Sequence, residues 1–154
     1  MSQVIERDRT LNQGRHVDTE LEVPNGRNFI SMLEAFRASG GVAPSPILDQ
    51  LFREYRVAKP VTLAELVATG LLFGFLWRDN LWVPMFQFEA EDLVVKACAQ
   101  KVRAQLPLLS GWTLASWFAT PKVQLDGHTP VDMLDSNLEA VLLATKSHDS
   151  FAHA

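Results

Sequence analysis

The stretch that decides the fold is residues 111–134, which read GWTLASWFATPKVQLDGHTPVDML. Its first part places apolar side chains at helical spacing, so it predicts a helix with one broad apolar face. Pro121 ends that helix, because proline disfavours the helical conformation in the residue before it. The pair Asp126-Gly127 predicts a turn, since glycine tolerates a positive φ. The apolar residues of the predicted helix are Trp112, Leu114, Ala115, Trp117 and Phe118.

A second helix is predicted directly after this turn. Thr129 is placed to cap its N-terminus, with Pro130 at the first helical position. Asp132 adds a negative charge in the first turn, where the helix dipole favours it. The stretch therefore encodes a helix, a sharp stop, a loop and a second capped helix.

This stretch resembles the C-terminal toxin-binding domain of the Xre/MbcA/ParS antitoxin family. The family pattern is Trp, a few residues, Trp-Leu or Trp-Phe, two residues, Pro-Asn, then Leu-x-Gly-x-x-Pro-x-Asp-Leu-Leu. The chain departs from it at Lys122, where the family usually has Asn. The resemblance extends from about Leu63 to the last residue. The matching positions, which we interpret as mostly structural, are Trp112, Trp117, Phe118, Pro121, Leu125, Gly127, Pro130, Asp132, Met133 and Leu134.

The resemblance implies a function in protein binding. Partners in this family are commonly toxins of the RES class, which act on NAD, and the antitoxin's C-terminal segment blocks the entrance to the toxin's active site. We therefore predict that the partner-binding residues are Lys146, His148, Asp149 and Phe151. Phe151 has two interpretations, contact with the partner or packing of the last helical turn. Family members are often dimers, so we also expect a homodimer.

A DNA-binding transcriptional regulator without a toxin partner is the alternative function, because family members often repress their own operon. Residues 47–69 have the outline of a helix-turn-helix. Basic and acidic residues nearly balance over residues 43–78, however, and the short helix LAELVAT offers no Arg, Asn or Gln to a base edge. We therefore interpret this segment as a structural helix pair.

The composition is that of a globular chain of 154 residues, 47% hydrophobic and 21% charged, with a net charge of −4. The negative charge argues against a general nucleic-acid binder. One cysteine, Cys98, excludes an intramolecular disulfide and a cysteine-cluster metal site. We expect a cytoplasmic protein, because no signal peptide or membrane-spanning stretch is present. No residue grouping suggests catalysis, a cofactor or a metal; His148, Asp149 and His153 match no standard metal spacing.

The predicted fold is mainly α: a compact helical domain with one β-hairpin at about residues 71–88 and a disordered N-terminal arm. We divide the chain into a flexible arm (1–27), a helical region with the hairpin (28–90) and an antitoxin-like helical domain (91–154). Pro84 should place the second hairpin strand at an edge or interrupt it. Further helices are predicted from a cap at Asn28 to about 39, over 47–56, over 63–69 and from the acidic run at Glu89 to about 105, and the last helix is predicted from a cap at Asp135 or Ser136. Thr62 and Glu65 are predicted to form a capping box at the start of the 63–69 helix, and Val94 is predicted on the inward side of the helix from Glu89.

Overall fold

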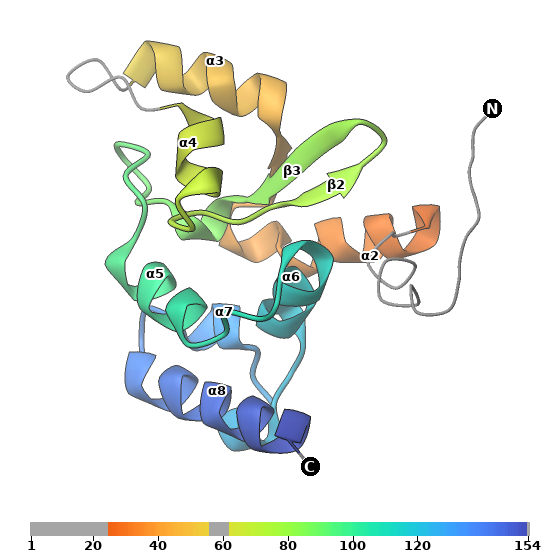
Figure 1. The fold of residues 1–154 in the computed structure, drawn as a ribbon, viewed down its shortest axis with the longest axis vertical. Coiled ribbons are helices and arrows are strands. Elements are labelled where there is room, and N and C mark those ends of the chain that lie inside the picture. The colour runs from red at the N-terminus through yellow and green to blue at the C-terminus, as the bar shows by residue number, and fades with distance from the viewer. Residues whose placement is uncertain (1–24, 56–61, 154) are drawn as a thin grey trace.

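The computed structural model describes residues 25–55 and 62–153, with side chains omitted for Tyr55 and from His148 onward. The fold is mainly α-helical with one small antiparallel sheet, which confirms the predicted fold class (Figure 1). The helices are α2 (Gly26–Ala35), α3 (Ser45–Tyr55), α4 (Leu63–Ala68), α5 (Ala97–Ala104), α6 (Gly111–Ala119), α7 (Pro130–Met133) and α8 (Leu138–His153). The strands are β1 (Val42–Pro44), β2 (Phe75–Trp77) and β3 (Asn80–Pro84), and short 3₁₀ turns cover Arg37–Ser39, Met85–Gln87 and Val123–Leu125.

Side-chain caps set the starts of two N-terminal helices. The predicted capping box of α4 is confirmed, because the Glu65 N–H donates to Thr62 Oγ1 at 3.1 Å and the Thr62 N–H donates to Glu65 Oε1 at 2.9 Å. The predicted cap of the first helix at Asn28 is wrong. Asn25 caps α2, because its extended backbone lets its side-chain oxygen accept from the Asn28 N–H at 2.8 Å.

The predicted hairpin is present, and a third strand completes the sheet in the order β1-β3-β2. Arg78 and Asp79 form its turn and both have positive φ. The unpredicted strand β1 pairs with β3, so β3 is central and its predicted edge position is wrong. The alternative prediction for Pro84 is confirmed, because β3 ends there and the Met85 N–H turns to the Gly41 carbonyl at 2.9 Å.

The helix predicted from Glu89 begins only at Ala97. The preceding residues form a tight loop instead, in which the Glu89 N–H donates to the Val94 carbonyl and Phe88 bridges to Val95. The helical spacing predicted the wrong side chain to be buried here, because the loop turns Val95 towards the core and Val94 towards water. Val95 is buried, whereas Val94, predicted to point inward, is 47% exposed.

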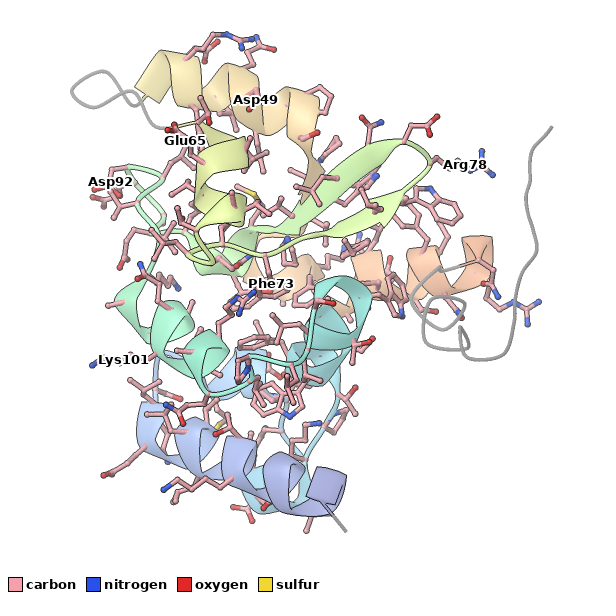
Figure 2. All side chains as sticks on the ribbon, in the orientation of Figure 1. Asp49, Glu65, Phe73, Arg78, Asp92 and Lys101 are labelled. Atoms are coloured by element: carbon pink, nitrogen blue, oxygen red, sulfur yellow. The ribbon has the colours of Figure 1, made fainter. Side chains whose placement is uncertain are left out.

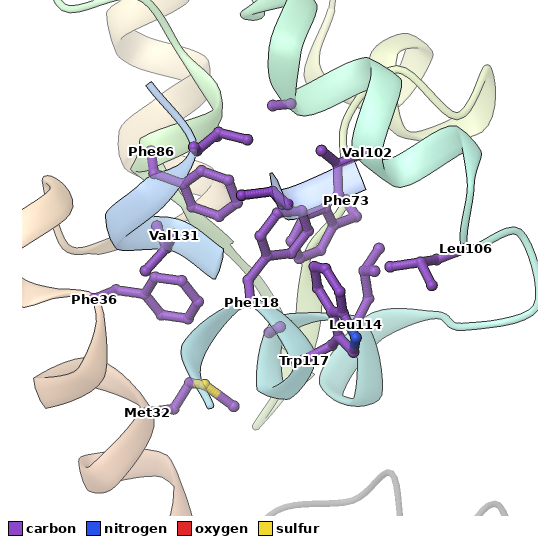
Figure 3. Packing of buried hydrophobic residues seen from close by; sticks show 14 of the residues in the cluster. Met32, Phe36, Phe73, Phe86, Val102, Leu106, Leu114, Trp117, Phe118 and Val131 are labelled. Atoms are coloured by element: carbon purple, nitrogen blue, oxygen red, sulfur yellow. The ribbon is translucent and has the colours of Figure 1, made fainter. Parts of the chain in front are cut away.

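The core consists of two apolar clusters. The main cluster includes Phe36, Phe73, Phe86 and Phe118, whose rings gather between the sheet and the helices (Figure 3). Phe118 stacks on Phe73 at 5.6 Å and lies 4.8 Å from Phe86, measured between ring centroids. Its members come from both sides of residue 90, so the two predicted regions share one core. The second cluster lies around α3 and α4, on the other side of the sheet (Figure 1), and includes Leu48, Phe52, Leu63, Leu66 and Val83.

A buried glutamine ties together the segments on either side of the hairpin. Gln87 is 2% exposed, and its Oε1 accepts from the Phe73 N–H at 3.0 Å. Its Nε2 donates to the carbonyls of Phe73 and Pro84 at 2.9 and 3.0 Å. Every polar atom of this side chain is therefore paired with backbone, as burial requires.

Candidate partner-binding region

The predicted Trp-rich helix is α6, and its inner face is an anchor of the main cluster. Trp117 is 5% exposed and meets Phe118 edge-to-face at 5.2 Å. Trp112 is half-buried and lies edge-to-face against Phe75 at 5.0 Å. The predicted stop is confirmed, because Thr120, which precedes Pro121, is extended at φ −101° and ψ 130°.

The loop after Pro121 closes on itself through the backbone of Lys122. The Lys122 N–H donates to the His128 carbonyl at 3.0 Å, and its own carbonyl accepts from the N–H groups of Leu125 and Gly127 at 3.0 and 2.9 Å. Asp126 and Gly127 both have positive φ, as the predicted turn requires. The departure from the family pattern at Lys122 therefore leaves the loop closed, because backbone atoms make these bonds.

The Lys122 side chain folds back over α6. Its ammonium lies 5.1 Å from the centre of the Trp117 ring, within the range of a cation–π contact. Burial lowers the pKa of Lys122, because the charged ammonium is partly removed from water.

The two last helices begin at side-chain caps. Thr129 Oγ1 accepts from the Asp132 N–H at 3.1 Å, with Pro130 at the first position of α7, as predicted. The predicted cap of the last helix at Asp135 or Ser136 is wrong, because it is Asn137 Oδ1 that accepts from the Ala140 N–H at 3.2 Å.

The residues that match the antitoxin pattern differ in burial, and those in α7 and the turn at Leu125 lie in elements that pack against α8. Trp117, Leu125, Pro130 and Leu134 are buried, Trp112 is half-buried, and Pro121, Gly127 and Asp132 are exposed. Helix α8 packs against α5, α7 and the 3₁₀ turn that contains Leu125, and it lies along one end of the molecule (Figure 1). The turn at Leu125 and α7, both within residues 111–134, thus form part of the surface against which α8 packs.

Helix α8 has a buried side and an exposed stripe. Val141, Ala144 and Thr145 are buried, and Thr145 Oγ1 donates to the Leu142 carbonyl within the same helix. Glu139, Leu143 and Lys146 are exposed at helical spacing, and Leu143 is 60% exposed. Leu143 was not predicted as a site residue, although its helical position, out of phase with Val141 and Ala144, indicated an outward side chain.

The predicted partner-binding residues all lie on α8. Lys146 is exposed and lies one helical turn after the exposed Leu143, so the two side chains are neighbours on the outer surface of α8. His148, Asp149 and Phe151 belong to the helical backbone, which continues to His153, but their side chains lie outside the described part. These three residues are therefore part of the last helix.

An unpredicted polar cluster joins α5 to the junction of α7 and α8. Lys96 Nζ lies 3.0 Å from Asp135 Oδ2, and the Cys98 thiol donates to Asp135 Oδ1 at 3.8 Å. Burial and the neighbouring Asp135 carboxylate raise the pKa of Cys98. The sequence did not predict this cluster because its two sides are 37 to 39 residues apart.

Figure 2 shows the contrast between surface and core side chains. Lys101 points away from the rest of the molecule, whereas Phe73 lies in its interior.

Comparison of the chain with protein-family models, with curated proteins and with solved structures finds no match. Within residues 25–55 and 62–153, no three His, Cys, Asp or Glu side chains are grouped to hold a metal ion. The helices of the described part include none long and apolar enough to cross a membrane.

Proposed function

We propose that this chain is an antitoxin-like protein-binding module that neutralises a partner toxin by covering its active site. A RES-type, NAD-degrading toxin is the candidate partner, on the strength of the resemblance in residues 111–134. The observation that carries the proposal is the exposed stripe of α8, a helix whose other side packs against α5, α7 and the turn at Leu125.

The chemistry of this stripe suits a protein partner. Leu143 exposes an aliphatic side chain between the charges of Glu139 and Lys146, and such mixed apolar and polar contacts are typical of protein interfaces. A rigid helix also presents side chains with less entropic cost than a loose segment does. His148, Asp149 and Phe151 follow Lys146 in the same helix, and the proposal assigns them to the partner contact as well.

Protein binding is a better proposal than DNA binding for this chain. The outer surface of α4, the second helix of the helix-turn-helix outline, carries Ala64, Glu65 and Ala68. Glu65 gives α4 a negative charge, and the helix has no Lys or Arg, so the phosphates of DNA would repel it. Salt-dependent binding of the full chain to a DNA duplex would favour the regulator instead.

The test uses the tagged full-length chain as bait in a lysate of its own cells. The captured protein should arrest growth and deplete NAD when expressed alone, and coexpression of the full chain should restore growth. Leu143→Asp should abolish both capture and rescue. The matched control is Leu108→Asp, which places the same charge on an aliphatic residue that is 91% exposed but lies on the α5–α6 connection.

A second variant, truncated after Ser147, separates the two interpretations of Phe151. If Phe151 contacts the partner, the truncated chain melts near the full-length value but captures nothing. If Phe151 packs on the core, the chain loses about 1.5–3 kcal/mol of unfolding free energy. Capture that survives both Leu143→Asp and the truncation would overturn the proposed function.

A further inference from the structure

Strand β2 lies at an edge of the three-stranded sheet (Figure 1). The two-residue turn of the hairpin has positive φ at both positions, so Trp77 and Asn80 form its closing hydrogen-bonded pair. Hydrogen-bonded and non-hydrogen-bonded pairs alternate along an antiparallel ladder. Leu76 and Leu81 are therefore a non-hydrogen-bonded pair, and the backbone N–H and C=O of Leu76 point away from β3, towards the edge.

This edge is open at Leu76. Neither its backbone N–H nor its C=O has a hydrogen-bond partner among residues 25–55 and 62–153, and its side chain is 68% exposed. Helix α6 approaches the edge one step earlier, because a Cβ at Gly111 would lie 3.6 Å from the Gly74 carbonyl oxygen. The open part of the edge is therefore Phe75–Trp77.

The opposite edge of the sheet, β1, is protected by proline. Pro44 lies opposite Trp82, whose backbone groups bond to Phe75 on β2, so the Pro44 nitrogen faces the outer side of β1. Proline has no N–H to donate there, and it is a common means of protecting an edge strand. Strand β2 has neither a proline nor a charged residue, so it is the edge that can accept another strand.

A second copy of this chain is complementary to that edge. In an antiparallel pair of β2 strands about a twofold axis at Leu76, each Leu76 donates its N–H to the C=O of the other. Leu81 and Leu76 are opposite each other on one face of the sheet, so this pair extends them into a row of four leucines across four strands. The two hairpin turns, with Arg78 and Asp79, then lie at opposite ends of the contact, and their like charges stay apart.

We propose that the chain forms a homodimer through β2, which joins two three-stranded sheets into one six-stranded sheet with Leu76 at its centre. Twofold pairing gives each unpaired N–H and C=O of Leu76 a backbone partner and removes both leucine side chains from water. The contact is short, so we expect association in the micromolar range. This inference is independent of the proposed function, because Leu76→Lys should still capture the partner of α8.

A charge at the edge tests the proposal in the full-length chain. Leu76→Lys places two ammonium groups opposite each other at the twofold axis, and like charges directly opposite destabilise a strand pair. We expect sedimentation equilibrium to give a dissociation constant at least about tenfold above that of the wild type. The matched control is Val123→Lys, because Val123 is 91% exposed but lies on the 3₁₀ turn that packs against α8. Its dissociation constant should equal that of the wild type.

Cross-linking tests the register of the two strands. In a Cys98→Ser background, Leu76→Cys brings two thiols to the twofold axis, where the Cα atoms of a hydrogen-bonded pair are about 5.5 Å apart, within the range of a disulfide. Mild oxidation should convert most chains to a covalent dimer, far above the yield of Val123→Cys in the same background. Melting curves close to that of the wild type show that the variants keep the fold. Equal yields, a wild-type chain that stays monomeric, or a dimer unaffected by Leu76→Lys would overturn the proposal.

Discussion

Replacing Gln87 with methionine tests whether the buried amide holds the hairpin region in place. Methionine has a similar length but no amide, so the Phe73 N–H and the carbonyls of Phe73 and Pro84 lose their partners. At about 1–3 kcal/mol for each unpaired group, the three groups cost about 3–9 kcal/mol. Burial of the apolar methionine side chain stabilises the folded state by about 2 kcal/mol, which offsets part of this loss. We therefore expect Gln87→Met to lower the unfolding free energy by about 4 kcal/mol, near the middle of the resulting range.

Urea unfolding followed by far-UV circular dichroism measures this loss. Phe73 stacks on Phe118 in the main cluster, so the near-UV signal of the aromatic core should weaken as well. The matched control is Gln124→Met on an exposed residue, which should change stability by less than about 0.5 kcal/mol. If Gln87→Met costs no more than this control, the three hydrogen bonds do not contribute as argued.

Four further outcomes are expected. Trp117→Ala should cost about 3–5 kcal/mol of unfolding free energy, as for other large buried aromatics, and an unchanged melting curve would show that the residue is not an anchor. Asn137→Ala should cost about 1 kcal/mol by removing the cap of α8, whereas Ser136→Ala should leave stability almost unchanged; the reverse order would restore Ser136 as the cap. The lowered pKa of Lys122 means that the folded chain releases this proton at a lower pH than the unfolded chain. As pH rises from the lowered pKa to 10.5, the unfolding free energy of the wild type should therefore increase relative to that of Lys122→Met. Parallel plots of unfolding free energy against pH for the two proteins would contradict this. Light scattering at micromolar concentration should give twice the chain mass of 17.2 kDa, and a mass of one chain would contradict the predicted homodimer.

Local sequence rules were sufficient for several features that depend on neighbouring residues. The capping box at Thr62 and Glu65, the cap at Thr129 and the helix stop at Pro121 were all predicted and are all present. Each depends on atoms within four residues, so the sequence itself contains the whole interaction. The exposed position of Lys146 belongs with them, because helical spacing sets the outward side of α8.

The candidate site was predictable only in part for the same reason. The matching residues were interpreted only as mostly structural, and the sequence did not indicate which of them would pack near α8. The exposure of Leu143 depends on which side of α8 is covered by α5, α7 and the turn at Leu125, and these contacts join distant segments. The partner-binding roles of His148, Asp149 and Phe151 stay predictions.

The sequence by itself determined most of the helices, the hairpin and the caps at Thr62 and Thr129, because these depend on nearby residues. The caps at Asn25 and Asn137 are equally local, but they lie one to three residues from the predicted positions. Tertiary structure decided that Val42–Pro44 is a strand, because β3 supplies its hydrogen bonds. It also decided that residues before Ala97 form a loop, because the Lys96 N–H bonds to the Gln87 carbonyl and the Lys96 side chain to Asp135. Such pairs form only after the chain has folded, since bringing distant segments together costs loop entropy that no local pattern encodes.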